Sequence, residues 1–166
     1  APARRCLVII AFSGHRPGRL GGHGLHNPVR YIITNVIATR LREQPVEHAI
    51  SGMALGVDQW AFEACLRVGV PVVAAVPFAG QDAIWPRAGR EAYAELLARA
   101  TRIEVVSPGS YEASKMQRRN EWMVDHCTDV WAVWDGSPGG TANCVRYAER
   151  RGRPVRNLWI EISNLL

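Results

Sequence analysis

The residues best suited to chemistry lie in three glycine-containing turns, each of which follows a short apolar run. The first turn reads Ser13-Gly14-His15-Arg16-Pro17. A glycine at such a bend lets backbone N–H groups approach an anion, and the serine, histidine and arginine side chains add donors. Ser13, Gly14, His15 and Arg16 are therefore candidate ligand-binding residues. A plain glycine turn with a solvated arginine is the alternative.

The second turn spans residues 51–58 and reads Ser-Gly-Met-Ala-Leu-Gly-Val-Asp. Two glycines four residues apart, just before a helix begins, are typical of an anion-binding helix terminus. We expect Gly52, Met53 and Gly56 to present backbone N–H groups to a ligand. Asp58 falls in the first helical turn, where it would either interact with the helix dipole or bond a sugar hydroxyl.

The third turn spans residues 135–143 and reads Asp-Gly-Ser-Pro-Gly-Gly-Thr-Ala-Asn. Again a glycine pair precedes a helix, and Gly139, Gly140 and Thr141 are expected to cradle a phosphate. The Thr141 hydroxyl could instead cap its own helix. Asp135 opens this turn and joins the candidate site. The Gly-Lys-Ser or Gly-Lys-Thr sequence of a Walker A loop occurs nowhere in the chain.

A fourth group of residues lies on the predicted helix over 112–126. Met116, Asn120 and Met123 are spaced to share one face of this helix. A polar group between two methionines needs a partner, so Asn120 and its neighbour Arg119 are expected to point into a cleft. An ordinary amphipathic helix, with its arginines in water, is the alternative.

Alternating strands and helices must position these turns. The pattern predicts strands over residues 6–12, 48–51, 71–76, 102–106, 129–134 and 154–162, and helices over 27–43, 57–68, 87–100, 112–126 and 141–151. Such alternation is typical of a three-layer α/β fold. We expect one Rossmann-like domain over residues 1–166, with a mostly parallel sheet of about six strands. Ligands bind at the carboxyl ends of such strands, where the turns should converge.

Composition narrows the classes of function. The 166 residues carry a net charge of +5, and all but one of the 20 basic residues are arginines. This excess favours an anionic ligand, although codon usage could also produce it. The chain contains no apolar run long enough to span a membrane, so we expect a cytoplasmic protein without a membrane partner. The cysteines and histidines lack the spacing of a metal site, so we expect no metal: Cys6, Cys65, Cys127, Cys144, His23, His26, His48 and His126.

Taken together, these blocks resemble the YpsA-like branch of the SLOG superfamily. This Rossmann-like group also includes the LOG phosphoribohydrolases and DprA. The resemblance covers nearly the whole chain and rests on residues 13–17, 51–58, 116–125 and 135–141. It implies a protein that binds a nucleotide, a nucleotide-derived signal or a nucleic acid, and it implies a homodimer.

The LOG motifs match only in part. Their helix pattern M-x-x-R-K-x-x-M is similar to residues 116–123, with Arg119 at the arginine and Asn120 at the lysine. Their turn P-G-G-x-G-T-x-x-E is one glycine step longer than the turn here, and Cys144 stands where the glutamate should be. Glycosidic cleavage usually needs a carboxylate, so LOG-type hydrolysis is not expected.

The function expected from the sequence is therefore binding, as a sensor or sequestering protein, of a phosphate-bearing nucleotide or ADP-ribose-like small molecule, with no further cofactor. One alternative is an enzyme acting at a ribosyl–base bond, with Asp58, Asp135 or Glu121 replacing the missing glutamate. Another is a DprA-like nucleic-acid binder. The C-terminal arginines favour the latter, but we do not expect nucleic acid as the partner, because no strip of aromatic and basic residues is evident.

Overall fold

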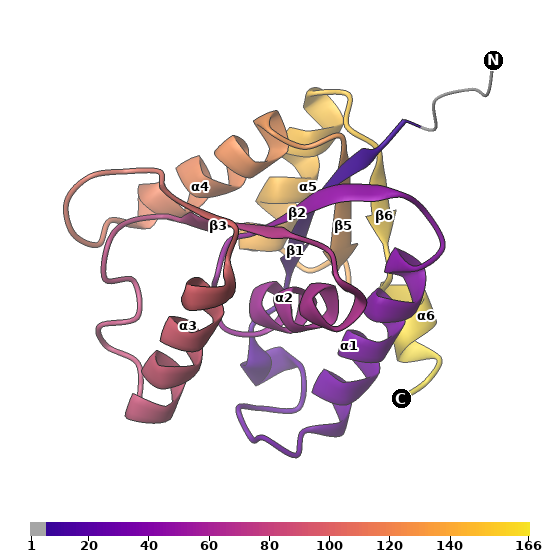
Figure 1. The fold of residues 1–166 in the computed structure, drawn as a ribbon, viewed down its shortest axis with the longest axis horizontal. Coiled ribbons are helices and arrows are strands. Elements are labelled where there is room, and N and C mark those ends of the chain that lie inside the picture. Colours follow the sequence, from indigo (N-terminus) through magenta and orange to yellow (C-terminus); the bar gives the residue numbers. More distant parts are fainter. Residues whose placement is uncertain (1–5) are drawn as a thin grey trace.

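A single six-stranded sheet organises the computed structural model, which describes residues 6–166 (Figure 1). Its strands are β1 (Val8–Gly14), β2 (Val46–Ser51), β3 (Val72–Val76), β4 (Arg102–Val105), β5 (Asp129–Val133) and β6 (Val155–Asn157). They lie in the order β4-β3-β2-β1-β5-β6, and every neighbouring pair is parallel.

Helices cover both faces of this sheet. They are α1 (Pro28–Leu41), α2 (Val57–Val68), α3 (Arg87–Arg99), α4 (Ala113–Asp125), α5 (Gly140–Arg150) and α6 (Trp159–Ser163), with one turn of 3-10 helix, η1 (Pro17–Arg19). Helices α4 and α5 pack on one face, and α1, α2, α3 and α6 lie on the other (Figure 1). The predicted α/β Rossmann-like class is therefore confirmed.

The inner strands are buried on both faces, as parallel strands between two helical layers must be. All five residues of β3, Val-Val-Ala-Ala-Val, are buried. Where β1 meets β5, Phe12 packs edge-on against Trp131 with ring centroids 6.0 Å apart. Trp131 thus belongs to the core.

The order of the strands reverses at one place. From β1 to β4 each new strand is added on the same side, and α4 then carries the chain back so that β5 pairs with the other side of β1. Helices that leave β1 and β5 diverge to opposite faces and open a crevice at the carboxyl ends of these two strands. The first and third glycine turns lie there.

The predicted sixth strand over residues 154–162 is wrong in length. The strand β6 stops at Asn157, and α6 begins two residues later. Asn157 causes the change, because its Oδ1 accepts hydrogen bonds from Trp159 N at 3.1 Å and Trp134 N at 3.2 Å. A side chain that bonds the backbone two residues ahead turns the chain.

Two predicted helix starts have different outcomes. Asn27 caps α1 as expected, with its Oδ1 accepting from Val29 N at 2.9 Å and Pro28 in the first helical position. Thr141 does not cap α5, because the helix already begins at Gly140, with Gly139 as the N-cap. In residues 6–166 no helix has the length and apolarity needed to cross a lipid bilayer.

Candidate functional site

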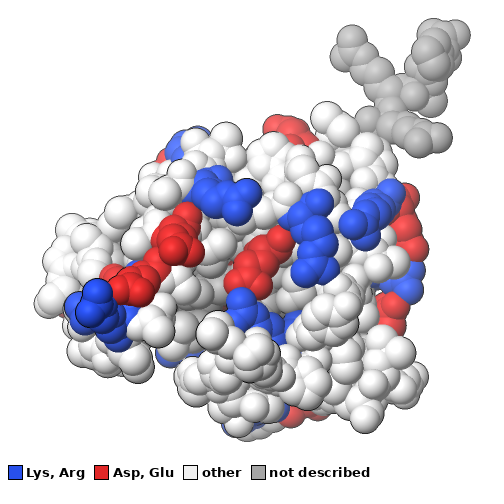
Figure 2. Space-filling view, turned by 60° about the horizontal axis from the view of Figure 1, so that its bottom comes forward, with Lys and Arg blue, Asp and Glu red and all other residues white. Residues whose placement is uncertain are grey.

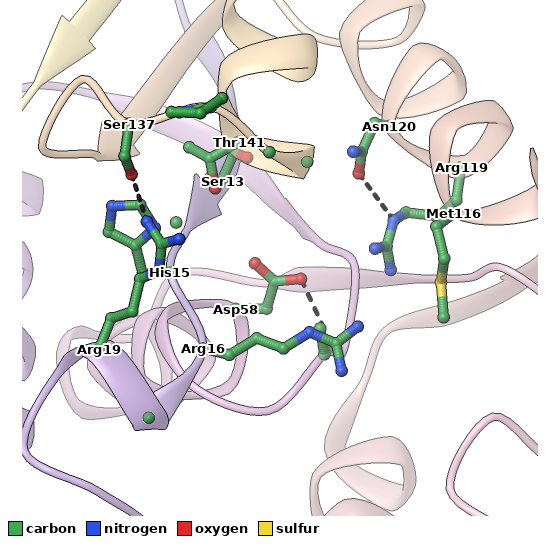
Figure 3. A pocket seen from close by; sticks show the side chains of 16 residues that line it. Ser13, His15, Arg16, Arg19, Asp58, Met116, Arg119, Asn120, Ser137 and Thr141 are labelled. Atoms are coloured by element: carbon green, nitrogen blue, oxygen red, sulfur yellow. Dashed lines mark hydrogen bonds between the residues drawn. The ribbon is translucent and has the colours of Figure 1, made fainter. Parts of the chain in front are cut away.

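A cleft of about 330 Å³ opens where the strand order reverses. The turns after β1 and β5 form two of its walls, the start of α2 forms its floor, and α4 forms the remaining side (Figure 3). The lining residues are Ser13, Gly14, His15, Arg16, Gly18, Arg19, Ala54, Asp58, Met116, Arg119, Asn120, Ser137, Pro138, Gly139, Gly140 and Thr141.

Arg119 is the buried cation of this cleft. It enters from α4 with only 4% of its surface exposed. Its guanidinium donates to the carbonyl oxygen of Gly52, and its Nε donates to Asn120 Oδ1 at 3.0 Å. Both partners are neutral. Burial lowers the pKa of Arg119, while the more distant Asp58 carboxylate acts in the opposite direction.

Gly52 is glycine because Arg119 needs the space. A Cβ atom on Gly52 would lie 2.6 Å from Cζ of Arg119. The glycine thus allows the guanidinium to pack directly on the backbone of the second turn. Gly52 therefore positions Arg119 from behind and does not itself line the cleft.

Asp58 is the carboxylate on the floor of the cleft. It lies in the first turn of α2, is buried, and its Oδ2 accepts from Ala54 N at 3.3 Å. Burial raises the pKa of Asp58, although Arg119 and Arg16 favour the charged form. Figure 3 shows this carboxyl near the Arg16 side chain, and Asp58 is the only acidic residue among the lining residues of the described chain.

Backbone N–H groups of the second turn already have hydrogen-bond partners within the protein. Met53 N donates to Ser51 Oγ at 3.2 Å, and Ala54 N donates to Asp58. Met53 is fully buried and adopts a φ of 61°, which is uncommon for a residue with a side chain. The expectation that Met53 and Gly56 offer N–H groups to a ligand does not fit this geometry, because neither residue lines the cleft.

Gly14 and Gly56 bring β1 and α2 together. A Cβ atom on Gly14 would lie 2.6 Å from the Val57 side chain, and one on Gly56 would lie 2.5 Å from the His15 carbonyl oxygen. Gly56 also has a φ of 95°. Val57 N donates to that same carbonyl at 3.3 Å. Close packing here places Asp58 beside the first turn.

A polar network ties the first turn to the third. His15 Nε2 donates to Asp135 Oδ1 at 2.8 Å, and the same oxygen accepts from Ser137 N at 3.0 Å and Ser137 Oγ at 2.5 Å. Arg19 from η1 donates to Ser137 Oγ (Figure 3). The Ser137 hydrogen bonds, followed by the one from His15, hold the pKa of Asp135 well below its usual range. Asp135 is not among the lining residues, but its carboxylate holds His15 and Ser137, which are.

The start of α5 closes the opposite side of the cleft. Its N-cap Gly139 has no side chain to occupy the first N–H groups, and the first intrahelical bond runs from Asn143 N to Gly139 O at 3.0 Å. Gly139, Gly140 and Thr141 all line the cleft. A helix N-terminus in this setting directs its N–H groups and its dipole toward an anion.

Cys144 does not replace the glutamate of the LOG motif. The side chain is buried among the apolar residues between α4, α5 and the sheet. Burial raises the pKa of its thiol to about 11, so the sulfur is neutral near pH 7. A neutral, buried thiol offers no charge to a cationic sugar.

Charges of both signs surround the cleft. Three arginines line it, Arg16, Arg19 and Arg119, against the one carboxylate of Asp58. On the face shown in Figure 2, blue and red side chains alternate and no broad area of one sign appears. On this face, positive and negative side chains are therefore interspersed, whereas arginines outnumber carboxylates in the lining of the cleft.

Sequence reasoning missed six of the lining residues: Gly18, Arg19, Ala54, Met116, Ser137 and Pro138. Ser137 and Pro138 lie inside the third turn and could have been included by position alone. Met116 shared a face with Met123, but only Met123 is fully buried in the core. Arg19 carried no signal, because η1 and its reach to Ser137 depend on the fold. In residues 6–166 no group of three or more His, Cys, Asp and Glu side chains could hold a metal ion.

The residues that form the cleft also match a known protein family. The YpsA family model, described as the YspA SLOG family, matches residues 10–156. This chain belongs to that family. The SLOG resemblance of the sequence is confirmed, and the match includes all four blocks that line or support the cleft.

Two proteins with similar sequences are relatives of this YpsA-family protein. The uncharacterized SPbeta prophage-derived protein YoqJ of Bacillus subtilis is 36% identical over 118 residues, which cover 61% of this chain and 68% of YoqJ. The UPF0398 protein ABC2016 of Shouchella clausii is 28% identical over 145 residues, which cover 81% of this chain and 76% of that protein.

Solved structures share the fold at low sequence identity. DNA processing protein A (DprA) of Streptococcus pneumoniae has a TM-score of 0.64 and 20% identity, covering 90% of this chain and 49% of DprA. The Helicobacter pylori DprA, described with a single-stranded DNA binding mode, has a TM-score of 0.64 and 17% identity, covering 89% of this chain and 63% of that chain.

A third structure is the molybdenum cofactor carrier protein of Chlamydomonas reinhardtii. It has a TM-score of 0.57 and 16% identity, covering 90% of this chain and 75% of the carrier. This YpsA-family protein thus spans about half of the pneumococcal DprA chain, and these similarities concern the fold. They do not support the expectation that nucleic acid is an unlikely partner.

Proposed function

We propose that this protein binds a phosphate-bearing nucleotide derivative in the cleft at the ends of β1 and β5. The observation that carries the proposal is Arg119. Its guanidinium is buried and bonded to two neutral oxygens, and among residues 6–166 no carboxylate lies within 4.0 Å of it. A buried cation without an ion partner is costly. A ligand phosphate would supply the missing negative charge through paired hydrogen bonds.

Other groups of the cleft suit the same ligand. The α5 N-terminus, at Gly139 and Gly140, would direct N–H groups at a phosphate, and exposed Arg16 would contact it from the first turn. The Asp58 carboxyl would accept hydrogen bonds from a ribose hydroxyl on the floor. The volume of about 330 Å³ falls at the lower end of small-molecule sites and suits a mononucleotide.

Calorimetric titration with AMP, ADP-ribose and NAD tests this proposal. Arg119→Ala should weaken binding at least about 100-fold, because a buried charged contact is lost. Arg118→Ala is the matched control, since Arg118 is the exposed neighbour on the same helix and does not line the cleft. Its affinity should equal that of the unmodified protein.

A second variant keeps the proposal testable even if Arg119→Ala does not fold. Arg16 is exposed, so Arg16→Ala should leave the fold intact, which circular dichroism checks. Its affinity should fall about 10-fold. The proposal fails if no nucleotide releases heat at millimolar concentration, or if folded Arg119→Ala binds as well as Arg118→Ala.

The proposed role is binding without LOG-type turnover, which the neutral, buried Cys144 supports. The second candidate is an enzyme acting at a ribosyl–base bond, and Asp58 favours it. A carboxyl whose pKa is raised by burial in a cleft has the character of a general acid or base. Chromatography of AMP and NAD after long incubation decides between them. Product that forms with the unmodified protein and not with Asp58→Asn would establish turnover.

The same titrations test whether the cleft binds nucleic acid. A short single-stranded oligonucleotide is added as a competitor of the nucleotide that binds best. Displacement that weakens steeply with added salt would assign the cleft to a nucleic-acid backbone. Persistence of nucleotide binding in its presence supports a small-molecule site.

A further inference from the structure

The two edges of the sheet are built differently. At one edge, β6 has three residues before the chain turns into α6. Asn157 Nδ2 also donates to Trp134 O at 2.8 Å, which ties the end of β6 to the end of β5. The guanidinium of Arg156 lies 5.2 Å from the ring of Trp131. An edge strand of only three residues offers little backbone for pairing with another strand.

The opposite edge, β4, is open and partly apolar. Its register with β3 sets Ile103 beside Ala74 and Val105 beside Val76, so both side chains share the sheet face that α3 covers. Ile103 is nevertheless 47% exposed and Val105 is 50% exposed. An unpaired strand edge with exposed β-branched residues is suited to pairing with a further strand.

The charges on β4 are complementary to themselves. Arg102 and Glu104 alternate with the apolar residues and share the other face of the sheet. Within one chain Arg102 Nε lies 3.2 Å from Glu104 Oε1, and both side chains are more than a third exposed. An antiparallel copy of this strand, centred on Ile103, would set Arg102 opposite Glu104 twice.

We propose that β4 pairs antiparallel with β4 of a second copy of this chain about a two-fold axis at Ile103. The two sheets then become one continuous sheet, and Ile103 contacts its own copy on the α3 face. On the α4 face each Arg102 contacts Glu104 of the other copy, as an isologous interface requires. Opposite charges across paired strands stabilise the pairing, whereas like charges oppose it.

The pattern also selects the register. Residues that lie opposite each other in paired strands must be on the same face of the sheet. The two-fold axis must therefore pass through a residue of β4 and not between two residues. Centring it on Arg102 would oppose two arginines, and centring it on Glu104 would oppose two glutamates. Ile103 is the centre that gives two oppositely charged pairs and an apolar contact.

Two charge reversals test the interface by sedimentation. Arg102→Glu alone should oppose glutamates, and Glu104→Arg alone should oppose arginines, so each variant should dimerise at least about 100-fold more weakly than the unmodified chain. An equimolar mixture should form a heterodimer, because every pair across the axis is then of opposite sign. The matched control is Arg87→Glu on α3, an exposed charge in a local pair with Glu91, which should leave the dimer intact.

Three outcomes would overturn the proposal: an unmodified chain that stays monomeric at about 100 μM, single variants that remain dimeric, or a mixture that fails to associate. Nucleotide titration of the same variants separates this interface from the cleft. The strand β4 lies three positions from β1 in the sheet, so monomeric variants should bind nucleotides as the unmodified protein does.

Discussion

The second and third glycine turns look alike in sequence and differ in the structure. Both hold glycines at the point where a helix begins. In the turn over residues 51–58, the N–H groups of Met53 and Ala54 are bonded to Ser51 and Asp58. In the third turn, α5 begins without a side-chain cap and its first residues line the cleft.

The glycines themselves explain the difference. Cβ atoms on Gly52 or Gly56 would collide with Arg119 or the His15 carbonyl, so the second turn is glycine-rich for close packing. Cβ atoms on Gly139 or Gly140 would meet nothing within 4 Å. A glycine pair before a helix therefore indicates an anion site only where neighbouring groups leave its N–H groups available.

The largest expected effect separates the two kinds of glycine. Gly56→Ala should lower Tm by about 10 °C, because it forces a side chain into a left-handed φ against a backbone oxygen. Gly140→Ala should change Tm by less than about 2 °C, since the added methyl group meets open space. Calorimetric melting measures both. Equal losses would remove the distinction between the turns.

A serine in each turn provides the next comparison. Ser51 Oγ donates to Asp58 O at 2.8 Å and accepts from Met53 N, and the residue is fully buried. Ser51→Ala should therefore cost about 2 kcal/mol in the free energy of unfolding, because buried groups lose their partners. Ser137→Ala, at a half-buried position, should cost about 0.5 kcal/mol or less. Urea unfolding gives both values, and a costlier Ser137→Ala would contradict the assignment.

Asp58→Asn should stabilise the protein while impairing binding. Folding raises the pKa of Asp58, so the folded state holds the proton more tightly than the unfolded state. Stability is therefore lost as pH rises from about 4, the unfolded value, toward the folded pKa. At pH 7 the amide should raise Tm by about 3 °C, with the gain shrinking on acidification. Nucleotide affinity should fall about 10-fold. A lower Tm at pH 7 would instead show that the carboxylate stabilises Arg119.

Asp135→Asn should have a smaller effect on Tm than Asp58→Asn, and the opposite dependence on pH. Folding lowers the pKa of Asp135, so its contribution to stability is present at neutral pH and is lost as pH falls through the folded pKa. The variant should melt about 2 °C below the unmodified protein at pH 7, and the difference should shrink below about pH 4. A difference that grows on acidification would refute the assignment.

Local patterns were sufficient to predict the fold. Continuous apolar runs such as Val72–Val76 indicate buried parallel strands, and Asn27 with Pro28 marks the start of a helix. The turns that follow the strands were located from glycines alone. The error at residues 154–162 arose because an apolar run hid the turn at Asn157, whose side chain acts on the backbone two residues ahead.

The candidate site was predicted less completely, because the availability of a polar group depends on distant residues. Gly52 looks like a ligand contact until Arg119 is placed on its carbonyl oxygen. Asp135 looks like a ligand contact until His15 and Ser137 are placed on its carboxylate oxygen. These contacts come from packing between elements, which no local spacing reveals.

The hydrogen bond from Arg119 to Gly52 also bears on how the protein folds. It joins residues 67 positions apart, so the cleft exists only after α4 has docked against the strands of the first half of the chain. A nucleotide that binds Arg119 therefore binds only to protein molecules in which the two halves of the chain have already packed together. Its stabilisation should slow global unfolding and hydrogen exchange of the slowest amides, rather than tighten one loop.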